Sequence, residues 1–193
     1  MTETRFFEPD GRGIPYTDEG RGPTVVLMPA VGDDIASLTA LAASLVTEDF
    51  RIVRIGWRAA AAVSLHDLAQ DVVDVLDHLG IEEAWVGGHA FGGSVARIVA
   101  RDHHARVNGV VLLGVEGPDG PAPRELPALA DGLPVLVIQG TEDAVTPPSN
   151  GEALQASAPG LVSVVSVEGG GHRFPATHVG ATSWAIEDYL DWD

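Results

Sequence analysis

Short apolar runs alternate with segments of helical periodicity along most of this sequence, and the alternation restricts the possible folds strongly. Apolar runs such as "TVVLMPA" (24–30) and "LPVLVIQG" (133–140) predict strands that are buried on both faces. The clearest helix is predicted at 64–80, where Ser64 and Asp67 form a capping box. Strands that alternate with helices predict an α/β fold, with a mostly parallel central sheet and helices on both faces.

The other predicted elements continue the pattern. We expect further strands at 4–11, 13–20, 50–57, 83–88, 107–115 and 161–171, and helices at 37–46, from Phe91, from about Pro147 and at 181–192. An Asp-Gly turn is expected between the first two strands. Since no repeat, low-complexity tract or linker interrupts the chain, we expect one domain over residues 1–193.

Composition excludes several kinds of chemistry. The chain has no cysteine, which excludes disulfides, thiolate nucleophiles and thiolate metal sites. All 11 basic residues are arginine, so a lysine Schiff base is also excluded. The net charge of −17 argues against nucleic acids and anionic membranes as partners, and favours a small neutral molecule. With no signal peptide and no apolar run long enough for a bilayer, we expect a cytoplasmic protein.

One stretch predicts a sharp turn between a strand and a helix: "VGGHAFGGSVAR", from Val86 to Arg97. Its glycines at 88, 92 and 93 let the chain turn tightly, with the apex in a strained backbone conformation. Ala90 occupies the apex, and the N–H of Phe91 begins the helix that follows.

Two other loops follow predicted strands at the same edge. Asp143 comes just after the strand at 133–140, and His172 comes just after the strand at 161–171. Because the carboxyl ends of parallel strands line one crevice, we expect Ala90, Asp143 and His172 to meet there.

This order of apex, acid and base resembles the α/β-hydrolase family over nearly the whole chain. The resemblance places residues 88–92 on the nucleophile elbow, Asp143 on the acid and His172 on the base. It places the N–H groups of Val31 and Phe91 in the oxyanion hole. It implies a hydrolase that acts on an ester, lactone or related carbonyl substrate and needs no cofactor.

Each residue also has a purely structural interpretation. Asp143 is compatible with capping the helix near Pro147, and His172 with an ordinary loop histidine. His89, beside the apex, is more typical of a packing residue than of a catalyst. Trp57 either contacts substrate or lies on the surface. The histidines of "DHHAR" (102–106) suit a helix end, and we assign no metal.

Ala90 departs from the family pattern because its methyl group cannot attack a carbonyl. It is an engineered replacement of serine, a native residue in a branch with other chemistry, or a sign of a non-catalytic ligand-binding protein. Two further departures favour a native alanine: Pro29-Ala30 replaces the usual His-Gly pair, and "GWRAAAAV" (56–63) replaces an acidic, glycine-containing loop. Ser94 lies one helical turn from the apex and does not replace the missing hydroxyl.

The alternative to covalent catalysis is a water activated by His172, with Asp143 fixing its tautomer. Many members of the family carry a helical cap before the acid-bearing strand, whereas only 116–132 fills that place here. We therefore expect no cap and an open, shallow site.

Overall fold

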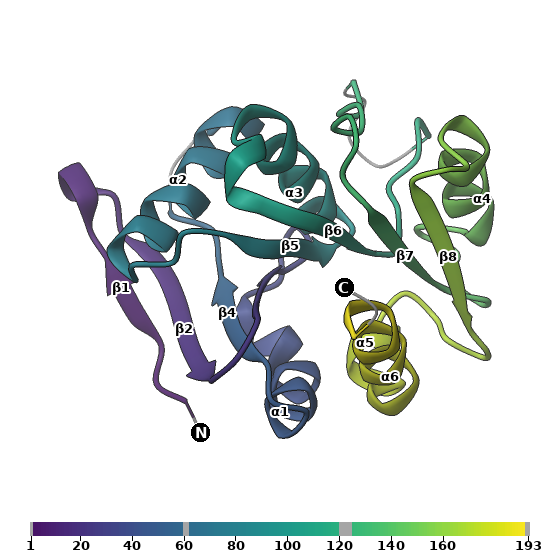
Figure 1. Ribbon diagram of the computed structural model, residues 1–193, viewed down its shortest axis with the longest axis horizontal. Coiled ribbons are helices and arrows are strands. Elements are labelled where there is room, and N and C mark those ends of the chain that lie inside the picture. Colours follow the sequence, from purple (N-terminus) through teal and green to yellow (C-terminus); the bar gives the residue numbers. More distant parts are fainter. Residues whose placement is uncertain (1, 60–61, 120–124, 192–193) are drawn as a thin grey trace.

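The computed structural model describes residues 2–59, 62–119 and 125–191. Within these ranges, eight strands form one sheet in the order β1-β2-β4-β3-β5-β6-β7-β8 (Figure 1). The strands are β1 (Arg5–Phe7), β2 (Ile14–Gly20), β3 (Thr24–Met28), β4 (Arg51–Ile55), β5 (Ala84–His89), β6 (Val107–Leu113), β7 (Val135–Gly140) and β8 (Val162–Val167).

The sheet is parallel except at its N-terminal edge. β1 pairs with β2 and β2 pairs with β4 in antiparallel register, and every later pairing is parallel. The turn between β1 and β2 places Asp10 and Gly11 at φ of 52° and 78°, as the Asp-Gly signal predicts. The predicted α/β fold with a mostly parallel sheet is confirmed.

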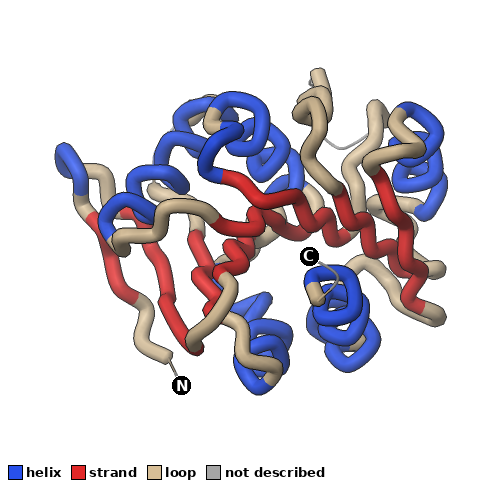
Figure 2. The backbone as a smooth tube through the Cα atoms, viewed as in Figure 1, coloured by secondary structure: helices blue, strands red, loops and turns tan. Residues whose placement is uncertain are grey.

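Helices cover both faces of this sheet (Figure 2). They are α1 (Thr39–Thr47), α2 (Leu65–His78), α3 (Phe91–Asp102), α4 (Pro148–Ser157), α5 (Phe174–Thr177) and α6 (Val179–Leu190). α2 and α3 pack on one face and α1 and α6 on the other, which gives two apolar clusters separated by the strands. Since both faces are covered, all six residues of β5 and of β7 are buried.

Helix boundaries follow local capping signals. α2 begins after Ser64, whose hydroxyl accepts from the N–H of Asp67 in the predicted capping box. The helix predicted at 37–46 is wrong in its first turn: Asp34 caps a 3-10 turn, and α1 begins only at Thr39. The closing helix predicted from 181 begins two residues earlier, at Val179, and Trp192 lies outside the described residues.

The connection between β6 and β7 bears on access to the sheet edge. Its described parts, 114–119 and 125–134, contain no helix, and residues 120–124 lie outside the described ranges. Residues 60 and 61 of the loop at 56–63 also lie outside them. None of the described helices is long and apolar enough to span a membrane.

Candidate active site

The turn between β5 and α3 has a strained apex. Ala90 adopts φ 48° and ψ −107°, a conformation that a residue with a Cβ rarely takes. Its N–H donates to the carbonyl of Leu113 at 2.9 Å, and its carbonyl accepts from Gly93 and Ser94 at 3.0 and 3.2 Å. The strand ladder on one side and the helix on the other therefore hold the strained residue in place.

Glycines allow this turn because backbones touch there. A Cβ added to Gly92 would lie 2.3 Å from the carbonyl oxygen of Met28 in β3. A Cβ on Gly88 would lie 2.5 Å from the carbonyl carbon of Gly92. Gly93 has more space, since its nearest neighbour, a methyl group of Leu112, would lie at 3.1 Å. The requirement for glycine, expected from sequence at all three positions, is thus strongest at Gly88 and Gly92.

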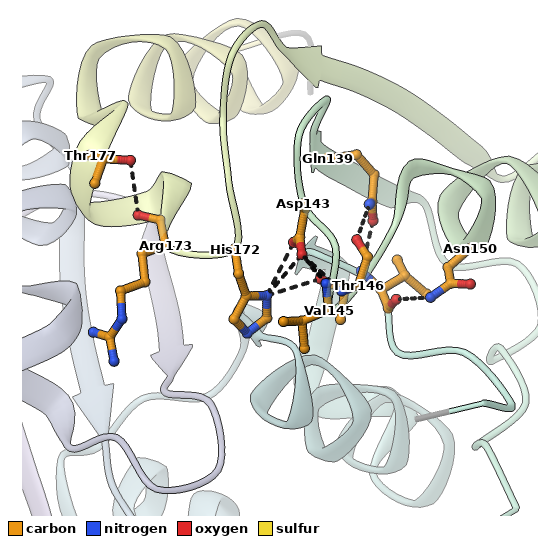
Figure 3. Close-up of polar contacts among 9 residues, drawn as sticks. Gln139, Asp143, Val145, Thr146, Asn150, His172, Arg173 and Thr177 are labelled. Atoms are coloured by element: carbon orange, nitrogen blue, oxygen red, sulfur yellow. Dashed lines mark hydrogen bonds and ion pairs between the residues drawn. The ribbon is translucent and has the colours of Figure 1, made fainter. Parts of the chain in front are cut away.

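His172 and Asp143 meet at the carboxyl ends of β8 and β7, as predicted (Figure 3). The Nδ1 atom of His172 lies 3.1 and 3.2 Å from the two carboxylate oxygens of Asp143. The carboxylate is fully buried, whereas the side chain of His172 is 26% exposed. The other ring nitrogen of His172 points away from the carboxylate (Figure 3).

The loop after β7 surrounds the Asp143 carboxylate with donors. The N–H groups of Val145 and Thr146 each donate to Oδ1 at 2.9 Å, and the Thr146 hydroxyl donates to Oδ2 at 2.6 Å. Burial alone would raise the pKa of Asp143, but the bonds from His172, Thr146 and Val145 together lower it to about 2. The carboxylate is therefore ionised at neutral pH and oriented toward the imidazole.

These contacts contradict the interpretation of Asp143 as a helix cap. The N-cap residue of α4 is Pro147, and no side chain caps that helix. Asp143 instead closes a turn within its own loop. Thr146 was not predicted as a site residue, although its Oγ1 also lies 3.3 Å from Nδ1 of His172. The Asp-x-x-Thr spacing in a turn is the sequence signal that points to it.

The ring of His89 packs against the ring of His172. The two ring centroids lie 4.6 Å apart, and the ring of Phe174 lies 6.2 Å away on the edge. His89 is 3% exposed, and its Nε2 has no hydrogen-bond partner among the described residues. Burial, together with the charge of His172, lowers the pKa of His89 to about 4. At neutral pH this histidine is uncharged, as a packing residue would be.

A hollow of about 170 Å³ lies over the turn and the imidazole. It is lined by Ala30, Val31, Ala90, Phe91, Glu116, Gly117, Val145, Thr146 and His172. Four residues predicted from sequence thus share this space: Val31, Ala90, Phe91 and His172. The hollow brings together loops that follow β3, β5, β6, β7 and β8.

Two predicted or considered residues lie elsewhere. Trp57 lines a separate hollow with Asp33 and other residues, and packs edge-on against Phe91 at 5.2 Å between centroids. Trp57 therefore packs against Phe91 and does not line the hollow over Ala90. Ser94 points to Glu116, with 2.6 Å between its Oγ and Oε2, and does not line the hollow. Glu116 was missed because it follows the end of β6 with no motif around it.

The histidines of "DHHAR" are part of surface structure. The Nε2 atom of His104 lies 3.0 Å from the backbone carbonyl of Asp131, and Arg106 pairs with Asp77 at 2.7 Å. Within the described part of the chain, no three His, Asp or Glu side chains gather in a geometry suited to a metal ion.

Comparisons with known proteins agree with this architecture. The model of the alpha/beta hydrolase family matches residues 24–179. A non-heme haloperoxidase from Rhodococcus erythropolis is 34% identical over 147 residues, which cover 70% of this chain and 52% of that protein. Epoxide hydrolase B from Mycobacterium tuberculosis is 34% identical over 104 residues, covering 49% of this chain and 29% of that protein. The chain thus spans about half, or less, of these relatives.

Solved structures show the same fold over the whole chain. A thermophilic esterase from Thermogutta terrifontis superposes with a TM-score of 0.83, at 18% sequence identity, covering 98% of both chains. The fold, the match of the family model over 24–179 and the similarity to these two relatives lead to one conclusion. This chain belongs to the alpha/beta hydrolase family.

Proposed function

We propose that this protein hydrolyses an ester, lactone or related carbonyl substrate in the hollow over Ala90, using the Asp143–His172 dyad as a general base. The observation that carries the proposal is the contact of 3.1 Å between His172 and the buried Asp143 carboxylate, with the imidazole lining a hollow. Such a pair has the geometry that general-base catalysis requires.

In this proposal Ala90 occupies the nucleophile position of the elbow, and a water replaces the missing hydroxyl. Because Nδ1 of His172 donates to Asp143, Nε2 is the atom that accepts a proton from this water. The oxygen of the water then bonds to the carbonyl carbon, and the carbonyl oxygen becomes an oxyanion. Asp143 stabilises the imidazolium that forms.

The oxyanion falls near the start of α3 and the turn after β3, where the N–H groups of Phe91 and Val31 are located. These donors and the positive end of the α3 dipole suit a developing negative charge. Collapse of the tetrahedral intermediate breaks the bond to the leaving oxygen, which takes the proton from Nε2 of His172. The products are an acid and an alcohol, and the dyad is restored.

An uncapped site is part of the same proposal. The described parts of the connection between β6 and β7 contain no helix, and two of their residues, Glu116 and Gly117, line the hollow. An open site favours soluble esters, lactones or larger acyl groups that reach it from solvent over a buried lipid chain. A small molecule is therefore the proposed partner.

The second candidate function is a catalytically silent protein that binds a small molecule in this hollow. One observation favours it: a methyl group stands at the apex, although the strained turn is retained. The two functions differ in what His172 does. In the hydrolase it moves a proton, and in the binding protein it only lines the wall.

Hydrolysis of p-nitrophenyl acetate by wild type, His172→Gln and Ala90→Ser separates these functions. We expect wild type to turn over slowly and His172→Gln to lose roughly 10²-fold or more, because a positioned base contributes roughly 10²–10⁴-fold. Ala90→Ser should release a burst of p-nitrophenol and gain one acetyl group, detected by intact-protein mass spectrometry.

The double variant Ala90→Ser/His172→Gln is the matched control, since it keeps the new hydroxyl and removes the base. It should give no burst. Wild-type turnover equal to that of His172→Gln, together with no acetylation of Ala90→Ser, would refute the hydrolase and support the binding protein.

A further inference from the structure

Arg97 is a buried cation that the hydrolase chemistry does not use. It lies on α3, the residue is 7% exposed, and its Nε is buried without a hydrogen-bond partner. Within the described residues its guanidinium forms no hydrogen bond and no ion pair. Buried arginines normally have such partners, because an unpaired buried charge is unfavourable.

Arg54 is the other arginine with a buried side chain in the described ranges, and unlike Arg97 it has partners for its guanidinium. Although its Nε also has no partner, its terminal nitrogens are bonded: one pairs with Glu19 at 2.9 Å and the other donates to the carbonyl of Ile35 at 2.9 Å. Arg54 thus has a structural role that its neighbours satisfy. Arg97 has no such set of neighbours.

Arg97 nevertheless keeps its charge. Burial lowers its pKa to about 10, and the charge of Glu116 acts in the opposite direction. The pKa remains well above neutral pH, so the guanidinium is cationic under ordinary conditions. A counter-charge from outside the described chain would satisfy it.

Space for such a group lies beside Arg97. A hollow of about 210 Å³ is lined by Arg97, Glu116 and Gly117, and by apolar side chains that include Val115, Leu126 and Leu154. Asn150 forms part of its wall and is fixed there by donating to the carbonyl of Val115 at 2.9 Å. Its lining comes from α3, from α4 and from the segment that follows β6.

This Arg97 hollow adjoins the site hollow over Ala90. Glu116 and Gly117 line both spaces, so the two hollows are immediate neighbours. Since a water takes about 30 Å³ of liquid volume, the Arg97 hollow has room for a short side arm of a few heavy atoms. A molecule whose carbonyl lies over Ala90 would extend this arm toward Arg97.

The chemistry of the hollow selects a carboxylate. A guanidinium binds a carboxylate through two parallel N–H donors, and the apolar walls suit the methylene groups that carry it. Glu116, whose carboxylate accepts from Ser94, lies at the junction of the two hollows and disfavours a second negative charge. The site therefore suits a monoanion better than a phosphate dianion.

We propose that the Arg97 hollow binds a free carboxylate of the substrate, so that the substrates are esters with a carboxylate a few bonds from the scissile carbonyl. This inference rests on the proposed hydrolase function, because only a hydrolase would turn over the bound carboxylate as a substrate. It replaces the neutral ligand expected from net charge with a monoanionic one, because a local buried cation outweighs a diffuse and screened surface charge.

Affinity for two matched probes tests the proposal directly. Monomethyl succinate carries the carboxylate, and dimethyl succinate is its neutral analogue. In NMR chemical-shift titrations we expect Arg97→Met to weaken binding of monomethyl succinate by about tenfold or more, and to leave dimethyl succinate unchanged. Arg97→Lys keeps the positive charge but lacks the two parallel N–H donors. It should lose part of the affinity for monomethyl succinate.

Arg101→Met is the matched control. Arg101 lies one turn further along α3, is exposed, and pairs with Asp102 away from the hollow. Its removal changes the net charge equally and should leave both probes unaffected. Equal losses in Arg101→Met and Arg97→Met would overturn the proposal, as would monomethyl succinate binding within about twofold of wild type in Arg97→Met.

A second pair of variants covers the case in which Arg97→Met does not fold. Leu154→Glu places a carboxylate opposite Arg97 and should abolish monomethyl succinate binding, whereas the uncharged Leu154→Gln should retain it. Equal binding by these two variants would also overturn the proposal. These titrations measure affinity and not turnover. If the protein proves not to be a hydrolase, they still show whether Arg97 binds the carboxylate.

Discussion

Acidification should destabilise this protein through His89 before it affects the Asp143 carboxylate. His89 is buried and uncharged, and its pKa is lowered from 6.5 to about 4 by burial and by the charge of His172. In the unfolded chain the imidazole regains an ordinary pKa near 6.5. Between these two values the unfolded state binds a proton that the folded state does not.

This difference in pKa determines how the stability of the folded state depends on pH. The folded state has its full stability above about pH 6.5 and loses stability as the pH falls toward 4. Since each pH unit between the two pKa values corresponds to about 1.4 kcal/mol, His89 accounts for a loss of about 3 kcal/mol. This loss is a large part of the free energy of unfolding of a typical native protein, which is about 5–15 kcal/mol.

Urea unfolding at a series of pH values from about 7 to 4 measures this loss. In His89→Phe, which keeps a ring against His172 and Phe174, the decrease in unfolding free energy over this range should be smaller by about 3 kcal/mol. His104→Gln, at an exposed position, is the control. Equal pH dependence in wild type and His89→Phe would refute the assignment of a buried, neutral imidazole to His89.

Two further predictions concern stability. Gly92→Ala brings a Cβ to within 2.3 Å of the Met28 carbonyl, so the unfolding free energy should fall by about 2–3 kcal/mol in urea titrations. A loss below about 0.5 kcal/mol would mean that β3 and α3 separate easily. Ser64→Ala removes the capping box of α2 and should lower the melting temperature through a loss of about 1 kcal/mol. Thr4→Ala, at an exposed position just before β1, should leave the melting temperature unchanged.

Local signals allowed much of the fold to be predicted. The capping box of Ser64 and the continuous apolar runs of β3 and β7 need only near neighbours in sequence, and these elements were predicted correctly. The start of α1 was not predicted correctly, because "SLTALAASLV" has helical periodicity from its first residue. Asp34, three residues before that stretch, competes by capping a 3-10 turn.

The site was predictable where it depends on topology alone. Asp143 and His172 were expected to meet because both follow parallel strands, and their contact is present. Trp57 also follows a strand, yet its ring turns toward Phe91, and no periodicity fixes the direction of a side chain beyond the end of a strand. The missing partners of Arg97 were not visible in sequence, since they depend on which side chains pack around α3.

The hydrogen bonds that surround the Asp143 carboxylate restrict where variants of the proposed hydrolase could be made. Two backbone N–H groups and the Thr146 hydroxyl fix its position, so the longer side chain of glutamate would lose several donors at once. Libraries that aim to enlarge the acyl group should therefore leave the loop after β7 intact. They should vary wall positions such as Val31, a residue that is 66% exposed and contributes only its backbone to the proposed chemistry.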